Sequence, residues 1–361
     1  MILFGCFEVP GWGGLTTATY RLFETLLGTG LDVHYLNLIP GEKLDYFREV
    51  FGPTYGNPKS LPNVHHSNLV GPLHEPHPEL RAVIEHVAPN VIVGVGDIAS
   101  YLMKRASPER RLLFLTSGSQ QVSRDAPFTE QQAVFDRAVS RPPIVDFKEH
   151  FAVAASDLII THSEMAKLIY LHFYPEHAHK IHREVIWFAE WIHQDAASYS
   201  AAILPFEERD IGVLFIASTW ARKEKNYDLV RALASRLDGM SIHIVGEVPD
   251  RFGGVRFHGI VGDRMKLFKL MARAKTVASP SLFDTAPGVL FEASAMDCNV
   301  VASKNCGNWF LCHDALLVDP FSVDTFVEKI TLAQSRKFPD NMDCFFRFES
   351  YKKLIGMLIE T

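Results

Sequence analysis

The chain has 361 residues, 47% of them hydrophobic and 22% charged, and this length predicts two domains, because it exceeds what one ordinary core holds. A formal net charge of -6 argues against nucleic acid or an anionic membrane as the main partner. No apolar stretch reaches the roughly 18 residues of a membrane span. The five cysteines have no C-x-x-C spacing, which predicts reduced thiols. Because the first residues also lack the features of a signal peptide, we expect a cytoplasmic location.

The first half of the chain predicts alternating strands and helices. An apolar strand at 1–7 precedes a glycine-rich loop, PGWGG, and a helix over 16–30 that has apolar residues at helical spacing. A second strand follows at 31–39, which completes a βαβ unit. Further buried strands are predicted from the apolar runs at 90–96, 111–117 and 157–163.

An irregular stretch rich in His, Pro and Ala, from about 175 to 210, predicts the domain boundary. A second alternating series follows, with strands expected at 211–218, 240–247 and 275–281 and helices at 226–237 and 263–274. The apolar segments 255–260, 300–303 and 315–320 continue the series. The expected fold is α/β, with two doubly wound Rossmann-like domains facing across a cleft. Their predicted bounds are 1–195 and 196–340, and an amphipathic helix is expected within 341–361.

The stretch FDTAPGVLFE, residues 283–292, sets two carboxylates, Asp284 and Glu292, around a turn at the start of a helix. Pro287 and Gly288 interrupt regular structure there, so backbone N–H groups are available to a ligand. A helix N-terminus attracts an anion, and carboxylates accept hydrogen bonds from hydroxyls. Phosphates and hydroxyls together describe a nucleotide sugar.

The segment PSLFDTAPGVLFEASAMDCNVVAS resembles the signature of the retaining family 4 glycosyltransferases, which have the GT-B fold. The resemblance extends to the glycine-rich opening PGWGGLTTATYRLF and to IGVLFIASTWARKEKNYDLV, which is similar to the family's strand, basic loop and helix start. It implies that the terminal FRFESYKKLI helix crosses back to the first domain.

The resemblance also implies roles for single residues. Glu292 is expected to accept hydrogen bonds from the ribose hydroxyls, Asp284 to lie near the donor sugar, and Lys225 to neutralise the diphosphate, with Arg222 and Lys223 sharing that task. The remaining expected donor contacts are Gly13, Gly14, Ala286, Gly288, Val289, His258 and Gly259. Asp97 and Ser117, at strand ends of the first domain, are expected to face the acceptor, although Asp97 fits a helix cap equally well.

No cofactor and no metal are expected. The family uses no bound metal, no D-x-D cluster is present, and the histidine-rich segment 172–193 has no carboxylate or cysteine at ligand spacing. The expected partners are a nucleotide sugar, UDP-linked rather than GDP-linked, and a hydroxyl acceptor on a saccharide or glycoconjugate; peripheral membrane contact and oligomeric state stay open.

Three departures from the family pattern leave alternatives open. Asp284 replaces a Glu, Ser117 stands where many relatives have a His that contacts the donor sugar, and Ser218 stands where relatives often have an Arg. One alternative is a sugar-nucleotide epimerase of the same fold, and another is a non-catalytic relative that binds nucleotide sugar. Locally, Asp284 also suits a turn cap, Glu292 a solvated helix acid and the basic run a solvated surface.

Overall fold

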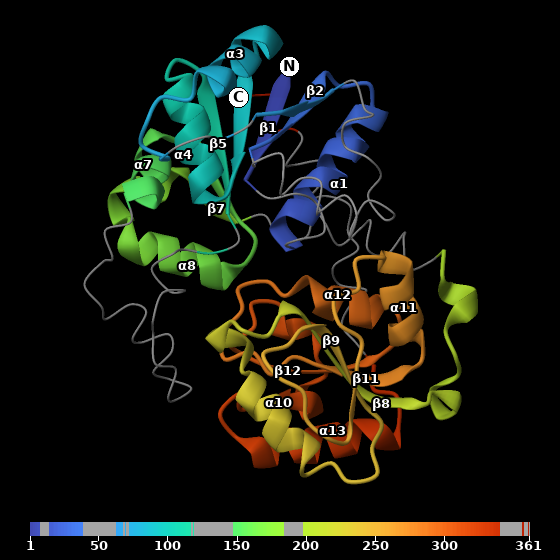
Figure 1. Ribbon diagram of the computed structural model, residues 1–361. Coiled ribbons are helices and arrows are strands. Elements are labelled where there is room, and N and C mark those ends of the chain that lie inside the picture. Colours follow the sequence, from blue (N-terminus) through green and yellow to red (C-terminus); the bar gives the residue numbers. More distant parts are fainter. Residues whose placement is uncertain are drawn as a thin grey trace. The chain divides into compact units, whose positions relative to one another are not determined.

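The computed structural model describes residues 1–7, 14–38, 63–67, 69, 72–116, 118, 147–183, 198–339, 356 and 360. The chain divides into two compact units: unit 1 contains the described residues up to 183, and unit 2 contains residues 198–339. Each unit is a parallel sheet covered by helices (Figure 1). The boundary predicted at 195 and the helix predicted within 341–361, apart from residues 356 and 360, lie outside the described residues.

The sheet of unit 1 has the strand order β3-β2-β1-β4-β5-β6-β7, and every neighbouring pair is parallel. The strands are β1 (Ile2–Cys6), β2 (Val33–Asn37), β3 (Val64–His66), β4 (Val91–Val95), β5 (Arg111–Thr116), β6 (Leu158–Thr161) and β7 (Ile181–Arg183). Most of them are buried apolar runs, as a parallel sheet covered on both faces requires. The two three-residue edge strands, β3 and β7, were not predicted, because so short a run has no readable period.

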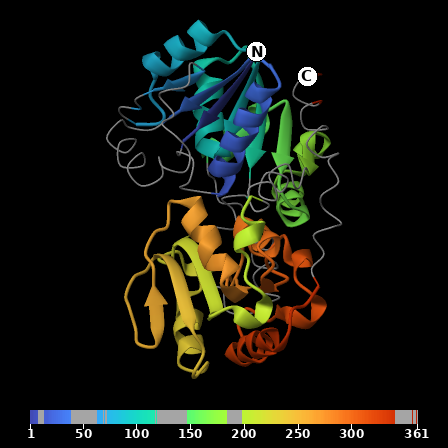
Figure 2. The same ribbon diagram turned by 90° about the vertical axis from the view of Figure 1, so that its right-hand side faces the viewer.

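Helices cover both faces of this sheet. They are α1 (Gly14–Gly28), α3 (Pro78–Val87), α4 (Gly96–Ala106), α7 (Phe147–Ala155) and α8 (Glu164–Phe173). Figure 2 shows α1, in blue, lying across the strands. Tyr20 and Phe23 of α1 pack on Tyr35 of β2, whereas Leu36, the next residue of the strand, packs on the opposite face with α3 and α4.

Unit 2 repeats the arrangement with the strand order β10-β9-β8-β11-β12-β13, again all parallel. The strands are β8 (Ile211–Thr219), β9 (Ile242–Glu247), β10 (Val255–Phe257), β11 (Ala274–Ala278), β12 (Asn299–Ser303) and β13 (Leu317–Val318). The strand order reverses between β8 and β11. In a doubly wound sheet, ligands bind beyond the carboxyl ends of the strands at such a switch point.

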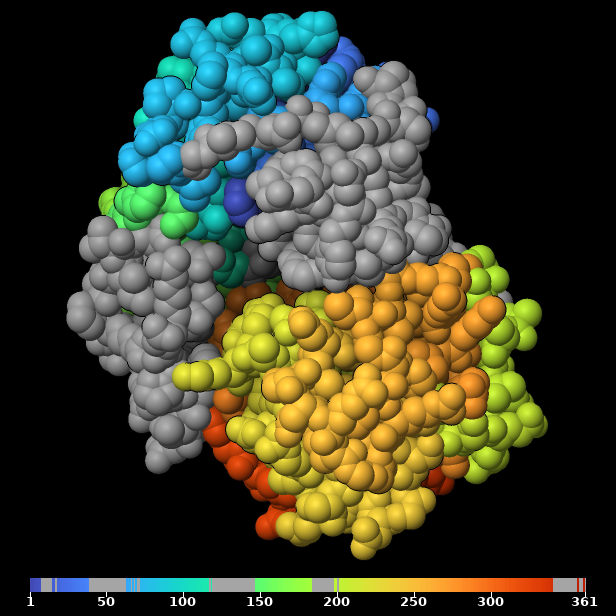
Figure 3. All heavy atoms as spheres, in the orientation of Figure 1, coloured from blue at the N-terminus to red at the C-terminus, as the bar shows by residue number. Residues whose placement is uncertain are grey.

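The helices of unit 2 lie in pairs on the two faces of its sheet (Figure 1). On one face, α10 (Tyr227–Ala234) and α13 (Val323–Ser335) share a buried cluster that includes Leu233, Phe326 and Ile330. The other face carries α11 (Arg264–Ala272) and α12 (Gly288–Ala295). The yellow-to-orange surface of unit 2 in Figure 3 is formed by the part of the chain that runs from α10 to α11. The predicted α/β fold class is therefore confirmed, whereas the predicted cleft between the domains stays a prediction.

A glycine brings β8 and β9 close together next to their carboxyl ends. Gly246 has a φ of +119°, and a Cβ built on it would lie 1.9 Å from the carbonyl oxygen of Ala217. Trp220 also links the two strand ends, since its Nε1 donates to the carbonyl of Val245 at 3.0 Å. Only glycine fits this position, because φ is positive and the space for a side chain is already filled.

Candidate functional site

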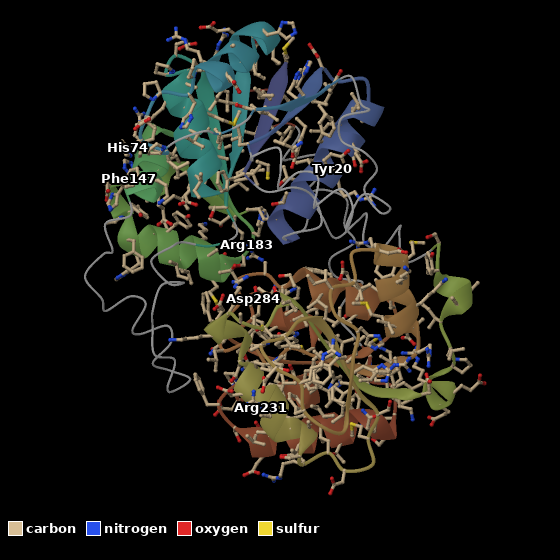
Figure 4. All side chains as sticks on the ribbon, in the orientation of Figure 1. Tyr20, His74, Phe147, Arg183, Arg231 and Asp284 are labelled. Atoms are coloured by element: carbon tan, nitrogen blue, oxygen red, sulfur yellow. The ribbon has the colours of Figure 1, made fainter. Side chains whose placement is uncertain are left out.

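The predicted donor-site residues of unit 2 follow the carboxyl ends of its strands. Arg222, Lys223 and Lys225 come after β8, His258 and Gly259 after β10, and the acid-turn-acid segment after β11. Because all these strands are parallel, the loops gather at one edge of the sheet. Figure 4 marks Asp284 on the α12 side of the unit, away from Arg231 on α10.

Hydrogen bonds to backbone carbonyls join the basic loop after β8 to the acidic loop after β11. The amide of Leu282 donates to the carbonyl of Glu224 at 2.8 Å. Asn226 has a left-handed backbone, with a φ of 58°, and its side-chain amide donates to the carbonyls of Pro280 at 3.1 Å and Pro320 at 3.0 Å. One backbone bond and the Asn226 side chain therefore hold the two loops together, independently of the charged side chains.

Lys225 and Asp284 meet across this junction. The lysine Nζ donates to Oδ2 of Asp284 at 2.5 Å, and the two side chains are only 17% and 18% exposed. The other carboxylate oxygen, Oδ1, accepts from the amide of Ala286 at 3.3 Å. A cation and an anion that sequence analysis assigned to diphosphate and sugar thus lie next to each other.

The loop after β12 supports the turn around Asp284. The Asp284 amide donates to the carbonyl of Asn305 at 3.1 Å, and its carbonyl accepts from Gly307 at 2.8 Å. Asn308 donates from its side chain to the carbonyl of Pro287 at 2.8 Å. Sequence analysis missed this support, although a loop of Asn and Gly directly after a buried strand is the pattern from which it could have been expected.

The helix α12 begins at Gly288 directly after this turn. Its N-cap residue is Pro287, which makes no side-chain capping bond, and the first backbone bond of the turn runs from Leu290 to Pro287. The N–H groups of Gly288 and Val289 belong to the first turn, where the helix dipole is positive. The amide of Ala286, in contrast, donates to the Asp284 carboxylate. It is therefore already used within the protein.

Glu292, two residues further into the helix than Leu290, is paired with a buried arginine. Its Oε1 lies 3.1 Å from Nη1 of Arg264, the first residue of α11, and the side chains are 14% and 5% exposed, respectively. Sequence analysis did not identify Arg264. The available signal was a cation in the first turn of a helix, an unfavourable position next to the helix dipole that calls for a carboxylate partner.

The other two basic residues of the loop differ from Lys225. Arg222 is paired with Glu224, with 2.5 Å between its Nε and Oε1, and its side chain is 53% exposed. Lys223 is also exposed. Within the described residues, the structure brings Lys225 to Asp284 and leaves Arg222 and Lys223 towards solvent.

The predicted base-binding stretch lies where β9 and β10 end. The amide of Gly246 donates to the carbonyl of Gly259 at 2.7 Å, and that of His258 donates to Ile244 at 2.9 Å. The imidazole of His258 turns back along the sheet, where its Nε2 lies 3.0 Å from Nδ1 of His243. Burial, reinforced by His258, lowers the pKa of His243 to about 4, and burial also lowers the pKa of His258.

The predicted positions of unit 1 are only partly described. Gly13 and Ser117 lie outside the described residues, and Gly14 is the first residue of α1. Asp97 is the second residue of α4, directly after the carboxyl end of β4, and the N-cap of that helix is Val95 rather than Asp97. Its place at a strand end is therefore confirmed, whereas its contact with an acceptor stays a prediction.

The described cysteines, Cys6, Cys298, Cys306 and Cys312, are buried and form no disulfide. Burial raises the pKa of Cys298 and of Cys306 to about 12, so these thiols stay protonated and unreactive at neutral pH. None of the helices in the described part of the chain is both long and apolar enough to span a bilayer. No cluster of three or more potential metal ligands occurs among the same residues.

The comparisons with known proteins concern the family likeness of one segment and the fold. The model of the family described as glycosyl transferases group 1 matches residues 210–334. No curated protein sequence matches the chain significantly.

Solved structures match over nearly the whole length. Sucrose-phosphate synthase from Thermosynechococcus elongatus is similar with a TM-score of 0.71 at 16% identity, covering 99% of this chain and 98% of the synthase. Anabaena HepE in complex with UDP and glucose has a TM-score of 0.66 at 14% identity and coverages of 100% and 99%.

The UDP-GlcNAc 2-epimerase from Methanocaldococcus jannaschii is also similar, with a TM-score of 0.58 at 13% identity, covering 100% of this chain and 99% of the epimerase. At sequence identities this low, the similarity to these structures shows only a shared fold. The chain therefore has the fold of the GT-B glycosyltransferases, and its residues 210–334 are similar to the family described as glycosyl transferases group 1.

Proposed function

We propose that the protein transfers a sugar from a nucleotide-diphosphate sugar to a hydroxyl acceptor, with retention of the anomeric configuration and without a metal ion. The contact between Lys225 and Asp284, at the junction of the loops after β8 and β11, carries this proposal. It places a cation and a carboxylate that can accept hydrogen bonds beside the N-terminus of α12, at the switch point of the sheet. A diphosphate with an attached sugar has the charges and hydroxyls that this group of residues complements.

The proposed chemistry breaks the bond between the anomeric carbon and the diphosphate oxygen. Both bonding electrons leave with the diphosphate, so negative charge grows on that oxygen while the anomeric carbon becomes electron-poor. Lys225 and the first-turn N–H groups of α12 stabilise the growing charge. The acceptor oxygen then bonds to the anomeric carbon from the same face, and its proton passes to the departing phosphate oxygen, which balances the reaction.

The donor is proposed to be a UDP-sugar. HepE was crystallised with UDP, with UDP and glucose, and with UDP-glucose, and these complexes share the fold described above. In this proposal the backbone of His258 and Gly259 contacts the base and Glu292 contacts the ribose. Residues 1–195 hold most of the acceptor.

A screen of nucleotides and their sugars tests the proposal. UDP, GDP and ADP are titrated against the protein by calorimetry, and the UDP-sugars are then incubated with a panel of saccharide acceptors under EDTA. We expect UDP to bind and a glycosylated product to form in the presence of EDTA, with the donor's anomeric configuration kept, as read by NMR. Nucleotide binding without transfer to any acceptor would favour the non-catalytic relative instead.

The epimerase stays the second candidate, because one similar structure has that activity. It requires an acid and a base at C2 of the sugar and no acceptor. Incubation with UDP-GlcNAc alone separates the two functions. A C2 epimer of the intact nucleotide sugar supports the epimerase, whereas an unchanged donor that reacts only when an acceptor is added supports the transferase.

A further inference from the structure

Arg264 occupies a position where an arginine is expected to lower the stability of the folded protein. It is the first residue of α11, whose start is fixed by Asp263: the carboxylate Oδ1 accepts from the amides of Met265 at 2.9 Å and Lys266 at 3.3 Å. A cation in the first turn opposes the helix dipole, and a buried guanidinium also loses its hydration. Both effects disfavour an arginine at this position.

Contacts with Phe268 and Glu292 help to hold the Arg264 side chain in one place. Its Cζ lies 4.8 Å from the ring centre of Phe268, one turn further along the same helix. Its Nη1 lies 3.1 Å from Oε1 of Glu292 on the neighbouring helix α12. With 5% of its side chain exposed, Arg264 has little freedom, so the carboxylate that it contacts is held as well.

We propose that Arg264 is a positioning residue, which holds the Glu292 carboxylate in the orientation that accepts hydrogen bonds from the ribose of the nucleotide. This inference rests on the proposed function. The contact with Arg264 uses Oε1, and a carboxylate has lone pairs for further bonds, so Glu292 can accept from a ribose hydroxyl while it stays paired. Arg264 itself need not touch the nucleotide.

The pairing has two expected effects on binding. A glutamate loses side-chain freedom when it binds a ligand, and Arg264 has removed that freedom before the nucleotide arrives. In addition, an unpaired Glu292 carboxylate would repel the diphosphate that binds nearby, and the Arg264 guanidinium neutralises the charge of this carboxylate. The first effect is worth about three- to tenfold in affinity and requires the ribose hydroxyls, whereas the second acts equally on any nucleotide diphosphate.

The test compares UDP with 2′,3′-dideoxy-UDP, which lacks the ribose hydroxyls, by calorimetry on the full-length protein. The measured quantity is the ratio of their dissociation constants for the wild type, Arg264→Met, Arg264→Lys, Glu292→Gln and the double variant Arg264→Met/Glu292→Gln. We expect the wild type to prefer UDP about tenfold, since hydrogen bonds to a charged group contribute that much. Arg264→Met should lose most of this preference, Arg264→Lys should restore part of it, and the double variant should match Glu292→Gln.

Arg231→Met is the matched control. Arg231 is a half-exposed arginine of α10 that pairs with Asp250, with Nη2 to oxygen distances of 2.6 and 2.8 Å, outside the candidate site. The Arg231→Met variant should leave the ratio of the two dissociation constants unchanged. Thermal unfolding of each variant verifies that α11 still packs, and Arg264→Lys preserves the test if Arg264→Met does not fold.

The outcomes separate the inference from the proposed function. If Arg264→Met weakens the binding of UDP and of 2′,3′-dideoxy-UDP equally, so that the ratio stays at the wild-type value, Arg264 does not position Glu292 for the ribose and the inference is overturned. Transfer by the wild type then leaves the proposed function standing. A wild type that does not discriminate between the two nucleotides overturns the inference together with the role of Glu292. A wild type that binds no UDP and transfers no sugar overturns the proposed function itself.

Discussion

The Nζ of Lys225 lies 2.5 Å from Oδ2 of Asp284, although 59 positions separate the two residues in the chain. Their contact joins the loops that follow β8 and β11, the two strands at which the order of the sheet reverses. An ammonium group has three donors, so Lys225 can keep its bond to Asp284 while it donates to a phosphate oxygen. Asp284 thus orients the cation on which the proposed reaction depends.

Replacing Lys225 by Met should slow transfer without unfolding the protein. The ammonium group stabilises charge that is larger in the transition state than in the bound donor, so its loss should lower kcat by about 10²- to 10³-fold and change KM less. Steady-state kinetics with a saturating acceptor measure both constants. Lys223→Met is the control, because Lys223 is exposed and two residues away; it should change kcat less than about threefold. Equal losses in the two variants would show that the loop contributes general positive charge rather than one placed cation.

Asp284→Asn tests whether the acid acts through Lys225. Asparagine keeps the size of the side chain and a carbonyl for the Ala286 amide, but it removes the charge that orients the ammonium group. We expect kcat to fall, and we expect the double variant Lys225→Met/Asp284→Asn to be no slower than Lys225→Met alone, since residues that act as a unit are not additive. Losses that multiply in the double variant would mean that Asp284 acts on the sugar independently of the lysine.

Much of the fold could be predicted from the sequence because its signals are local. Apolar runs of five or six residues between loops mark β1, β4 and β5, and the helix over 16–30 agrees with α1. Short edge strands such as β3, with three residues, carry too few side chains for a pattern.

The sequence identified several residues of the candidate site, but it did not identify the contacts between them. Lys225, Asp284 and Glu292 were all identified by spacing and resemblance, yet the pairs that they form depend on the packing of distant segments. Arg264 lies 28 positions before Glu292 (292 − 264), on another helix, and nothing in the local sequence names its partner. The same holds for Asn308, whose bond to Pro287 spans 21 positions.

Folding stability should depend on His243 between about pH 4 and 6.5. In the folded protein its pKa is lowered to about 4, whereas the unfolded chain has the ordinary value near 6.5. The unfolded state therefore binds more protons in this range, and stability falls as the pH decreases from 6.5 towards 4, by up to about 1.4 kcal/mol per pH unit from this residue. His258, Arg256 and Arg273 oppose its protonation, and Asp210 favours it.

The measurement is urea unfolding of the wild type and of His243→Gln at several pH values. We expect a flatter dependence on pH in the variant, whatever its stability at pH 7. His74→Gln is the control, since His74 is exposed and lies in unit 1; its curve should run parallel to that of the wild type. Parallel curves for His243→Gln and the wild type would mean that His243 is not protected from protons in the folded state.

Gly246→Ala should damage both the stability and the nucleotide site of unit 2. The new methyl group would overlap the Ala217 carbonyl at 1.9 Å, and the backbone φ of +119° is unfavourable for any side chain. Strain and overlap together should cost at least about 2 kcal/mol. Relief requires β8 and β9 to separate, which would also displace Gly259, whose carbonyl accepts from the Gly246 amide. Gly253→Ala is the matched control, because its Cβ would meet nothing within 4 Å. Thermal unfolding and UDP titration of both variants measure the effect: Gly253→Ala should resemble the wild type, and a Gly246→Ala variant of unchanged stability would show that β8 and β9 can separate at that corner without loss.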